Sequence, residues 1–245
     1  MHALHKLLLF QVLASLGQNA DGSRIMKGAI APDDTYEFLV SLQSNKKHVC
    51  GGFLISEDFV LTAAHCSADD EDGMVVLGTH HLSKPRNKIK EHIESTCKPT
   101  TGIGNDIMLI KINSKKPDDL PEKIQLQDPE TDVTENEKCQ VAGWGPVEND
   151  GSVRVDQLRV VDVTVISQKA CKDQIPGLRA NAICTGGKQG GFCKSDAGGP
   201  LVCKGKAVGI ATVNDNCSFG LPNVYIDISK YRSWINRCIE AKKCL

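Results

Sequence analysis

The 245-residue chain has almost no net charge, because 29 Lys and Arg residues face 30 Asp and Glu residues. No overall field therefore attracts nucleic acid or an anionic membrane surface. Beyond the N-terminal segment the sequence lacks any apolar run long enough for a membrane anchor, and it contains no internal repeat, low-complexity tract or linker. We expect no nucleic-acid partner and no membrane anchor.

The N-terminus has the pattern of a secretory signal. His2, His5 and Lys6 precede an apolar run over residues 7–16, which is too short to span a hydrocarbon core of roughly 30 Å. Small residues predict cleavage after Gly17, with Ala20 as the alternative site. Residues 1–17 are thus a predicted signal peptide, and the protein is expected to be secreted or stored in secretory granules.

The 11 cysteines agree with export, since disulfides persist in oxidising compartments. None lies in a C-x-x-C pair, which disfavours a zinc ribbon or a redox motif. The sequence predicts no metal and no cofactor. Because the number is odd, at least one cysteine is left unpaired or pairs with another molecule.

Short runs rich in aliphatic and β-branched residues, separated by turn residues, predict an all-β fold. They cover residues 38–42, 52–56, 59–63, 74–77, 107–112, 140–143, 158–165, 200–203, 207–212 and 224–228. Helical spacing is clear only at the end of the chain, where Asp227 or Ser229 can cap the start. One face of that helix carries Tyr231, Trp234, Ile235, Cys238 and Ile239.

Three segments carry the candidate chemistry, in the order histidine, aspartate, nucleophile loop. The first reads Leu-Thr-Ala-Ala-His-Cys and ends at Cys66, with Cys-Gly-Gly at 50–52 upstream. The second is Asn-Asp-Ile-Met-Leu-Ile at 105–110, and the third is Cys-Lys-Ser-Asp-Ala-Gly-Gly-Pro-Leu-Val-Cys at 193–203. This order is typical of chymotrypsin and differs from that of subtilisin and the α/β-hydrolases.

The three segments together resemble the trypsin-like serine proteases (peptidase family S1). Val-Ala-Gly-Trp-Gly at 141–145 and Pro-Asn-Val-Tyr at 222–225 extend the resemblance, which runs from Ile25 to the C-terminal helix. Leu-Gly-Thr-His at 77–80 is most similar to granule-type members: granzymes, mast-cell proteases and duodenases.

The resemblance implies two packed antiparallel six-stranded β-barrels with a C-terminal helix, and a peptidase domain over residues 25–245. His65 and Asp106 would lie on the first barrel and Ala197 on the second. In such a site the histidine is the general base, and the aspartate orients it and stabilises its charged form.

The resemblance also implies activation by cleavage. An activating protease would cut after Arg24, removing a propeptide of residues 18–24 and freeing the α-amino group of Ile25. That ammonium would pair with Asp196, because a buried charge must be paired. Met26-Lys27 departs from the usual I-x-G-G.

The nucleophile loop departs from the family's Gly-Asp-Ser-Gly-Gly-Pro. Ala197 stands at the nucleophile position and has no oxygen, while Ser195 replaces the oxyanion-hole glycine. Ser195 and Ala197 thus occupy the two positions whose N–H groups bind the oxyanion. The Ser195 hydroxyl, two residues upstream, is displaced by several ångströms from the nucleophile position, which excludes it as a substitute.

The residues of the specificity pocket depart as well. Gly191 and Phe192 form its expected floor, where trypsin-like Arg or Lys specificity needs Asp. Its wall reads Thr212, Val213, Asn214, and Asn223 replaces a glycine at the rim. These larger groups predict a narrowed or filled pocket.

Four disulfides follow from the resemblance: Cys50–Cys66, Cys139–Cys203, Cys171–Cys184 and Cys193–Cys217. Cys97, Cys238 and Cys244 remain. We expect Cys97 to pair with Cys238 or Cys244. The leftover cysteine would be a buried thiol in a monomer or the link of a disulfide-bonded dimer.

The leading interpretation is a secreted serine-protease homologue without catalytic activity, which binds a protein or peptide, such as a protease inhibitor, along the former active-site cleft. The alternative is an active serine endopeptidase of granzyme or duodenase type, in which Ala197 is an engineered or erroneous substitution. A cationic antimicrobial or heparin-binding homologue is opposed by the net charge of -1.

Overall fold

The computed structural model describes residues 28–66, 73–83, 89–100, 105–114, 116–146, 155–212 and 220–245. The predicted signal peptide and propeptide, and with them Arg24 and Ile25, lie outside the described residues, as do Val213, Asn214 and Cys217. Within the described ranges, no helix has the length and apolar character needed to cross a membrane.

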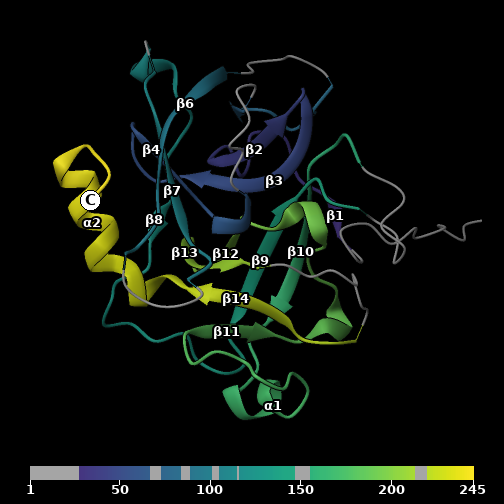
Figure 1. The fold of residues 1–245 in the computed structure, drawn as a ribbon. Coiled ribbons are helices and arrows are strands. Elements are labelled where there is room, and N and C mark those ends of the chain that lie inside the picture. Colours follow the sequence, from purple (N-terminus) through teal and green to yellow (C-terminus); the bar gives the residue numbers. More distant parts are fainter. Residues whose placement is uncertain are drawn as a thin grey trace, which may run out of the picture.

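Strands and two short helices alternate with turns along the described chain (Figure 1). The elements are β1 Ala29–Ile30, β2 Leu39–Ser44, β3 Lys47–Leu54, β4 Phe59–Thr62, β5 Met74–Leu77, β6 Ile89–Cys97, β7 Met108–Ile112, β8 Gln125–Leu126, β9 Lys138–Gly143, β10 Arg159–Thr164, α1 Gln168–Lys172, β11 Ala182–Thr185, β12 Pro200–Cys203, β13 Lys206–Ala211, β14 Asn223–Asp227 and α2 Arg232–Ala241.

The first lobe is the predicted six-stranded barrel, closed in the order β2-β3-β4-β7-β6-β5 with every pair antiparallel. Its interior is filled by aliphatic and aromatic side chains such as Leu42, Phe53 and Leu61. Alternate side chains along each strand of such a barrel point inward, so every strand contributes to one core.

The second lobe is an antiparallel sheet in the order β1-β10-β9-β12-β13-β14-β11, with β8 joined to β13 in parallel. A β-bridge between Val165 and Thr185 connects the end of β10 to the end of β11 and bends the sheet toward closure. The prediction of two β lobes is therefore confirmed. The second lobe is a partly open barrel, because a single β-bridge, and not a full strand pairing, joins the ends of β10 and β11.

The C-terminal helix α2 packs beside the first lobe and buries Trp234, Ile235 and Cys238 in a core cluster that joins that barrel to β13 and β14 of the second lobe (Figure 1). A 3₁₀ turn over Ile228–Tyr231 precedes α2, and the Asp227 side chain accepts a hydrogen bond from the Ser229 N–H at 2.9 Å. The helix thus starts later than its apolar spacing indicates, because Asp227 caps the 3₁₀ turn instead of the α-helix.

Candidate functional site

His65 lies just after β4, in a 3₁₀ turn over Ala64–Cys66. The disulfide Cys50–Cys66 ties this turn to β3. The histidine therefore lies at the end of a barrel strand, in a short turn that the disulfide fixes in place.

Asp106 directly precedes β7, and β7 is the neighbour of β4 in the barrel. Each Asp106 carboxylate oxygen is 2.9 Å from His65 Nδ1, and the His65 backbone N–H donates to Oδ1 at 3.0 Å. Burial raises the pKa of Asp106, but the hydrogen bonds and charge of His65, with a contribution from Arg179, outweigh it and leave the pKa below its ordinary value. Asp106 is held as an anion that orients the imidazole ring.

A second set of hydrogen bonds fixes the segment around Asp106. The Tyr231 hydroxyl donates to Asn105 Oδ1 at 2.7 Å, and Asn181 Nδ2 donates to the Tyr231 oxygen at 2.5 Å. Sequence reasoning placed Tyr231 only on the apolar face of the C-terminal helix. No local pattern indicates this contact, since Tyr231 and Asn105 are 126 residues apart.

Ala197 lies at the end of a 3₁₀ turn over Lys194–Asp196 in the second lobe. Its carbonyl accepts a hydrogen bond from the Gly51 N–H at 2.8 Å and is 3.7 Å from Cys66 Sγ. The structure thus brings Ala197 beside the turn that carries His65, as the three motifs predict. The alanine methyl is fully buried.

The Ala197 N–H donates to the Lys194 carbonyl at 3.3 Å, within the same 3₁₀ turn. In serine proteases the N–H at this position points at the oxyanion of the substrate. Here the donor is engaged by the loop's own backbone. Sequence reasoning proposed this N–H as an oxyanion donor and did not predict its internal acceptor.

Ser195 is 5% exposed, and its buried hydroxyl has no hydrogen-bond partner among the described residues. Its carbonyl accepts a hydrogen bond from His48 Nε2 at 2.9 Å, while His48 Nδ1 is 2.9 Å from Ser41 Oγ. A carbonyl can only accept, so Nε2 carries the proton and Nδ1 accepts from the Ser41 hydroxyl. The nucleophile loop is therefore fastened to the first lobe through His48.

Asp196 is buried, at 2% exposure, and both carboxylate oxygens accept backbone hydrogen bonds. Gly145 N donates to Oδ1 at 2.6 Å and Cys193 N to Oδ2 at 3.0 Å. Burial raises the pKa of Asp196 to about 6, although these two hydrogen bonds lower it. Such an environment favours a cation beside the carboxylate.

The described residues that were predicted to line a specificity pocket pack against one another or against nearby backbone. Asn223, 3% exposed, lies against Gly191 so closely that a Cβ there would overlap its amide, and Asn223 Nδ2 donates to the Gly190 carbonyl at 3.2 Å. Phe192 is buried edge-on against Tyr225, with ring centroids 5.2 Å apart. The N–H and hydroxyl of Thr212 both donate to the Val224 carbonyl, at 3.2 and 3.0 Å.

Three predicted disulfides are present: Cys50–Cys66, Cys139–Cys203 and Cys171–Cys184. Cys193 is also disulfide-bonded, and its expected partner, Cys217, lies outside the described residues. Of the two partners left open for Cys97, the structure selects Cys244. Cys238 is a free and fully buried thiol, a position that does not support a disulfide-linked dimer.

The residues Cys50, His65 and Cys66 bring three potential metal-ligand atoms together. The two sulfurs form the disulfide and offer no thiolate, so this group does not fit a metal ion.

A closed antiparallel barrel packed on a second β lobe, with a histidine–aspartate pair on the first and a Gly-Gly-Pro loop on the second, is the architecture of the trypsin-like serine proteases.

Comparison with known proteins agrees with this class. The family model described as Trypsin matches residues 25–235, so the chain belongs to the trypsin family. It is 34% identical to granzyme B of Rattus norvegicus, over 96% of this chain and 99% of that protein. It is also 34% identical to duodenase-1 of Bos taurus, over 96% and 97% of the two chains. The solved structure of neuropsin, a serine protease of mouse brain, superposes with a TM-score of 0.78 at 28% identity, covering 87% of this chain and 99% of neuropsin.

Proposed function

We propose that the protein is a secreted, catalytically inactive member of the trypsin family that acts by binding a protein or peptide. The observation that carries the proposal is Ala197, which supplies no hydroxyl beside the His65–Asp106 pair. Without that hydroxyl, His65 has no nucleophile proton to remove. Loss of the nucleophile lowers turnover in serine proteases by about a millionfold.

Two further features support inactivity. The Ala197 N–H, one of the expected oxyanion donors, is already bonded to the Lys194 carbonyl. Asn223 fills the space beside Gly191 into which a substrate side chain would enter. Restoring the hydroxyl alone would leave the oxyanion without a free N–H donor at residue 197. It would also leave the substrate side chain without open space beside Gly191.

The alternative is an active endopeptidase like the proteases it matches, with Ala197 as an engineered or erroneous substitution. It requires only one residue to differ from an active enzyme. Ser195, Phe192 and Asn223 depart as well, and their side chains are all buried. Concerted change in the nucleophile, the oxyanion loop and the pocket favours a chain no longer selected for catalysis.

Export and maturation belong to the same proposal. The disulfides suit an oxidising compartment, as residues 1–17 would require. Cleavage after Arg24 would supply the α-amino group of Ile25 as the cation that the buried Asp196 carboxylate lacks among the described residues.

Catalytic competence is tested by three proteins beginning at Ile25: the parent, Ala197→Ser, and the combination of Ser195→Gly, Ala197→Ser and Asn223→Gly. Each is exposed to a fluorophosphonate probe and a peptide library, with His65→Ala as the control in both serine backgrounds. We expect no labelling of the parent, weak labelling of the single variant and stronger, His65-dependent labelling of the triple variant. Labelling of the parent would refute inactivity. Robust cleavage by Ala197→Ser alone would refute the argument from the pocket.

Binding is tested by panning a random-peptide phage library on the parent. Selected peptides should bind Lys194→Glu, altered at an exposed residue beside Ala197, more weakly than the parent. Lys206→Glu, in the salt bridge with Asp128, is the matched control. Failure to select any peptide, or equal loss in both variants, would contradict binding at this surface.

A further inference from the structure

An open pocket of about 490 Å³ lies on the outer face of the second lobe. Its walls come from the loop before β2, from β9 and β10, and from the hairpin between β12 and β13. Pockets for small ligands have volumes of about 300–1,000 Å³. None of the lining residues belongs to the candidate site beside His65.

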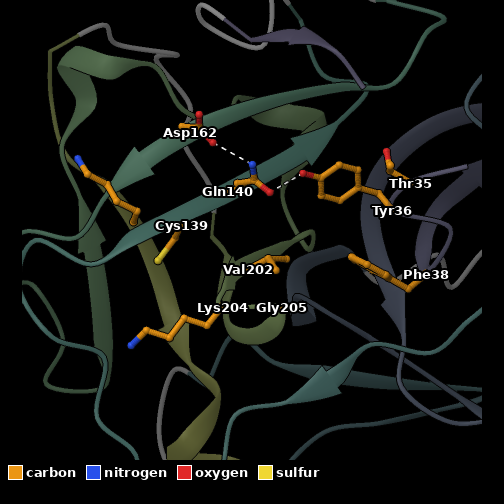
Figure 2. A pocket seen from close by; sticks show the side chains of 10 residues that line it. Thr35, Tyr36, Phe38, Cys139, Gln140, Asp162, Val202, Lys204 and Gly205 are labelled. Atoms are coloured by element: carbon orange, nitrogen blue, oxygen red, sulfur yellow. Dashed lines mark hydrogen bonds between the residues drawn. The ribbon is translucent and has the colours of Figure 1, made fainter. Parts of the chain in front are cut away.

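One wall is a chain of side-chain hydrogen bonds. The Tyr36 hydroxyl donates to Gln140 Oε1 at 2.6 Å, and Gln140 Nε2 donates to Asp162 Oδ1 at 2.9 Å. Figure 2 shows this chain along one side of the pocket, with Val202 and Phe38 below it. The Gln140 amide is satisfied on both atoms, so it holds the wall in place.

The backbone holds Tyr36 in an unfavourable conformation. Its φ is 55°, and that of Asp34 in the same loop is 62°. A left-handed conformation is uncommon for a bulky aromatic residue and persists only where the surroundings enforce it. The hydrogen bond to Gln140 and the edge-on contact with Phe38, at 6.0 Å between ring centroids, provide that enforcement.

Among the described residues, the pocket presents one cation and one anion without partners of opposite charge. Lys138 Nζ donates to the Thr164 hydroxyl at 2.7 Å, and Asp162 accepts a hydrogen bond from the Gln140 amide. Within the described ranges neither forms a salt bridge. By contrast, Lys204 is neutralised by Glu137 at 3.1 Å.

The strand register places the two charges on one face. Asp162 is opposite Gln140, and Thr164 is opposite Lys138, so Lys138 and Asp162 are diagonal neighbours, with Cα atoms roughly 7–8 Å apart. Half-buried Phe38 and Val202 add apolar surface beside them. A ligand that matches this arrangement carries an ammonium, a carboxylate and an apolar group.

We propose that this pocket binds a small zwitterion, an α-amino acid with an apolar side chain. Its ammonium contacts Asp162, its carboxylate contacts Lys138, and its side chain packs on Phe38 and Val202. The site is independent of the surface beside His65, and its occupancy does not depend on whether the protein is an enzyme.

The test is an ¹⁵N NMR titration of the mature chain with L-phenylalanine, 3-phenylpropionate and 2-phenylethylamine, which share the aromatic group and differ in charge. L-phenylalanine should shift the amide signals of Tyr36, Gln140 and Gly205 and bind about threefold or more tightly than either singly charged analogue. Shifts that do not cluster at the pocket, or a singly charged analogue that binds as tightly, would overturn the proposal.

Charge-removing variants test which charged group of the ligand Lys138 and Asp162 each bind. Lys138→Met should abolish the advantage of L-phenylalanine over 2-phenylethylamine, and Asp162→Asn its advantage over 3-phenylpropionate. The asparagine side chain keeps an oxygen that accepts from Gln140, so the wall is preserved. Lys206→Met, which breaks a salt bridge outside the pocket, should leave all three affinities unchanged. An equal effect of this control would refute the assignment.

Discussion

At the scale of single residues, neighbouring glycines allow the Asp196 carboxyl to be buried, and burial raises its pKa. A Cβ at Gly143 or Gly145 would overlap the Asp196 carboxylate, so only glycine leaves room for it. The carboxylate is buried with two N–H donors, and two such bonds do not replace the hydration that an ion loses on burial. A pKa of about 6 follows from this imbalance.

The raised pKa predicts a pH-dependent stability of the chain left uncut after Arg24. Below about pH 4 the carboxyl is protonated in both states. Above that pH the Asp196 carboxyl ionises in the unfolded chain before it ionises in the folded protein. The free energy of unfolding therefore falls as the pH rises through about 6. A shift of about two units corresponds to a loss of about 3 kcal/mol in the free energy of unfolding.

Urea unfolding at pH 4 and pH 7 measures this loss. Asp196→Asn should remove most of it, and cleavage after Arg24 should reduce it, because the Ile25 ammonium would then favour the ionised form. An undiminished loss in Asp196→Asn would show that other groups cause it.

At the scale of elements, α2 is attached to the first lobe both by packing and by a disulfide. Trp234 and Ile235 enter the core cluster, and Cys244 beyond the helix is bonded to Cys97 at the end of β6. The helix ends at Ala241, and its C-cap Lys242 has a left-handed conformation with φ of 51°, after which the chain reaches Cys244. Packing and the covalent link thus act on the same contact.

Removing the Cys97–Cys244 disulfide should destabilise the protein. Replacing Cys97 and Cys244 together by alanine should lower the free energy of unfolding by about 2–4 kcal/mol, since the bond closes a loop of 147 residues. Cys238→Ala, which removes only a buried thiol, should cost about 1 kcal/mol. Urea denaturation measures both. Alkylation of Cys97 or Cys244 in the native protein would contradict the pairing.

At the scale of the whole molecule, two segments join the lobes on the side of β1 and β10. The Leu158 N–H donates to the His80 carbonyl at 2.7 Å, and the Leu82 N–H to the Asp156 carbonyl at 3.0 Å. The Asp156 side chain accepts from the Ser83 N–H and hydroxyl, at 2.5 and 2.8 Å. Backbone and side-chain bonds therefore join one lobe to the other on this side of the molecule.

Asp156→Ala should weaken this junction. Burial raises the pKa of Asp156, but the hydrogen bonds from Ser83, together with the charge and hydrogen bond of His81, outweigh it and lower the pKa. Its contribution is present at neutral pH and is lost as pH falls below about 4. We expect thermal unfolding at pH 7 to occur at a lower temperature than in the parent, with the difference disappearing in acid.

Asp119→Ala, which breaks an exposed pair with Lys116, is the control and should change little. Equal effects of the two substitutions would show that Asp156 does not hold the lobes together.

Most strands could be predicted from local composition, but β1, β6, β8 and β11 lie outside the predicted runs, and the longest of these four is β6. Its sequence, Ile-Lys-Glu-His-Ile-Glu-Ser-Thr-Cys, is rich in charged residues, and the basic run over residues 84–90 indicates a solvated loop. The strand forms because β5 and β7 pair with it on both edges, while its alternate side chains remain in solvent. Pairing with neighbours overrode a weak local preference.

The sequence by itself determined that the nucleophile hydroxyl is absent, and it determined the chain order of the motifs that remain. Ala197 has no hydroxyl in any conformation, and the motifs around His65, Asp106 and the Gly-Gly-Pro loop, in that order, resemble those of the trypsin-like serine proteases. Tertiary structure alone decided that Cys97 bonds Cys244, that Asn223 fills the space beside Gly191, and that Tyr231 supports Asn105. Those contacts join residues tens to more than a hundred positions apart, so they depend on how strands and helices pack and not on the periodicity of any one segment.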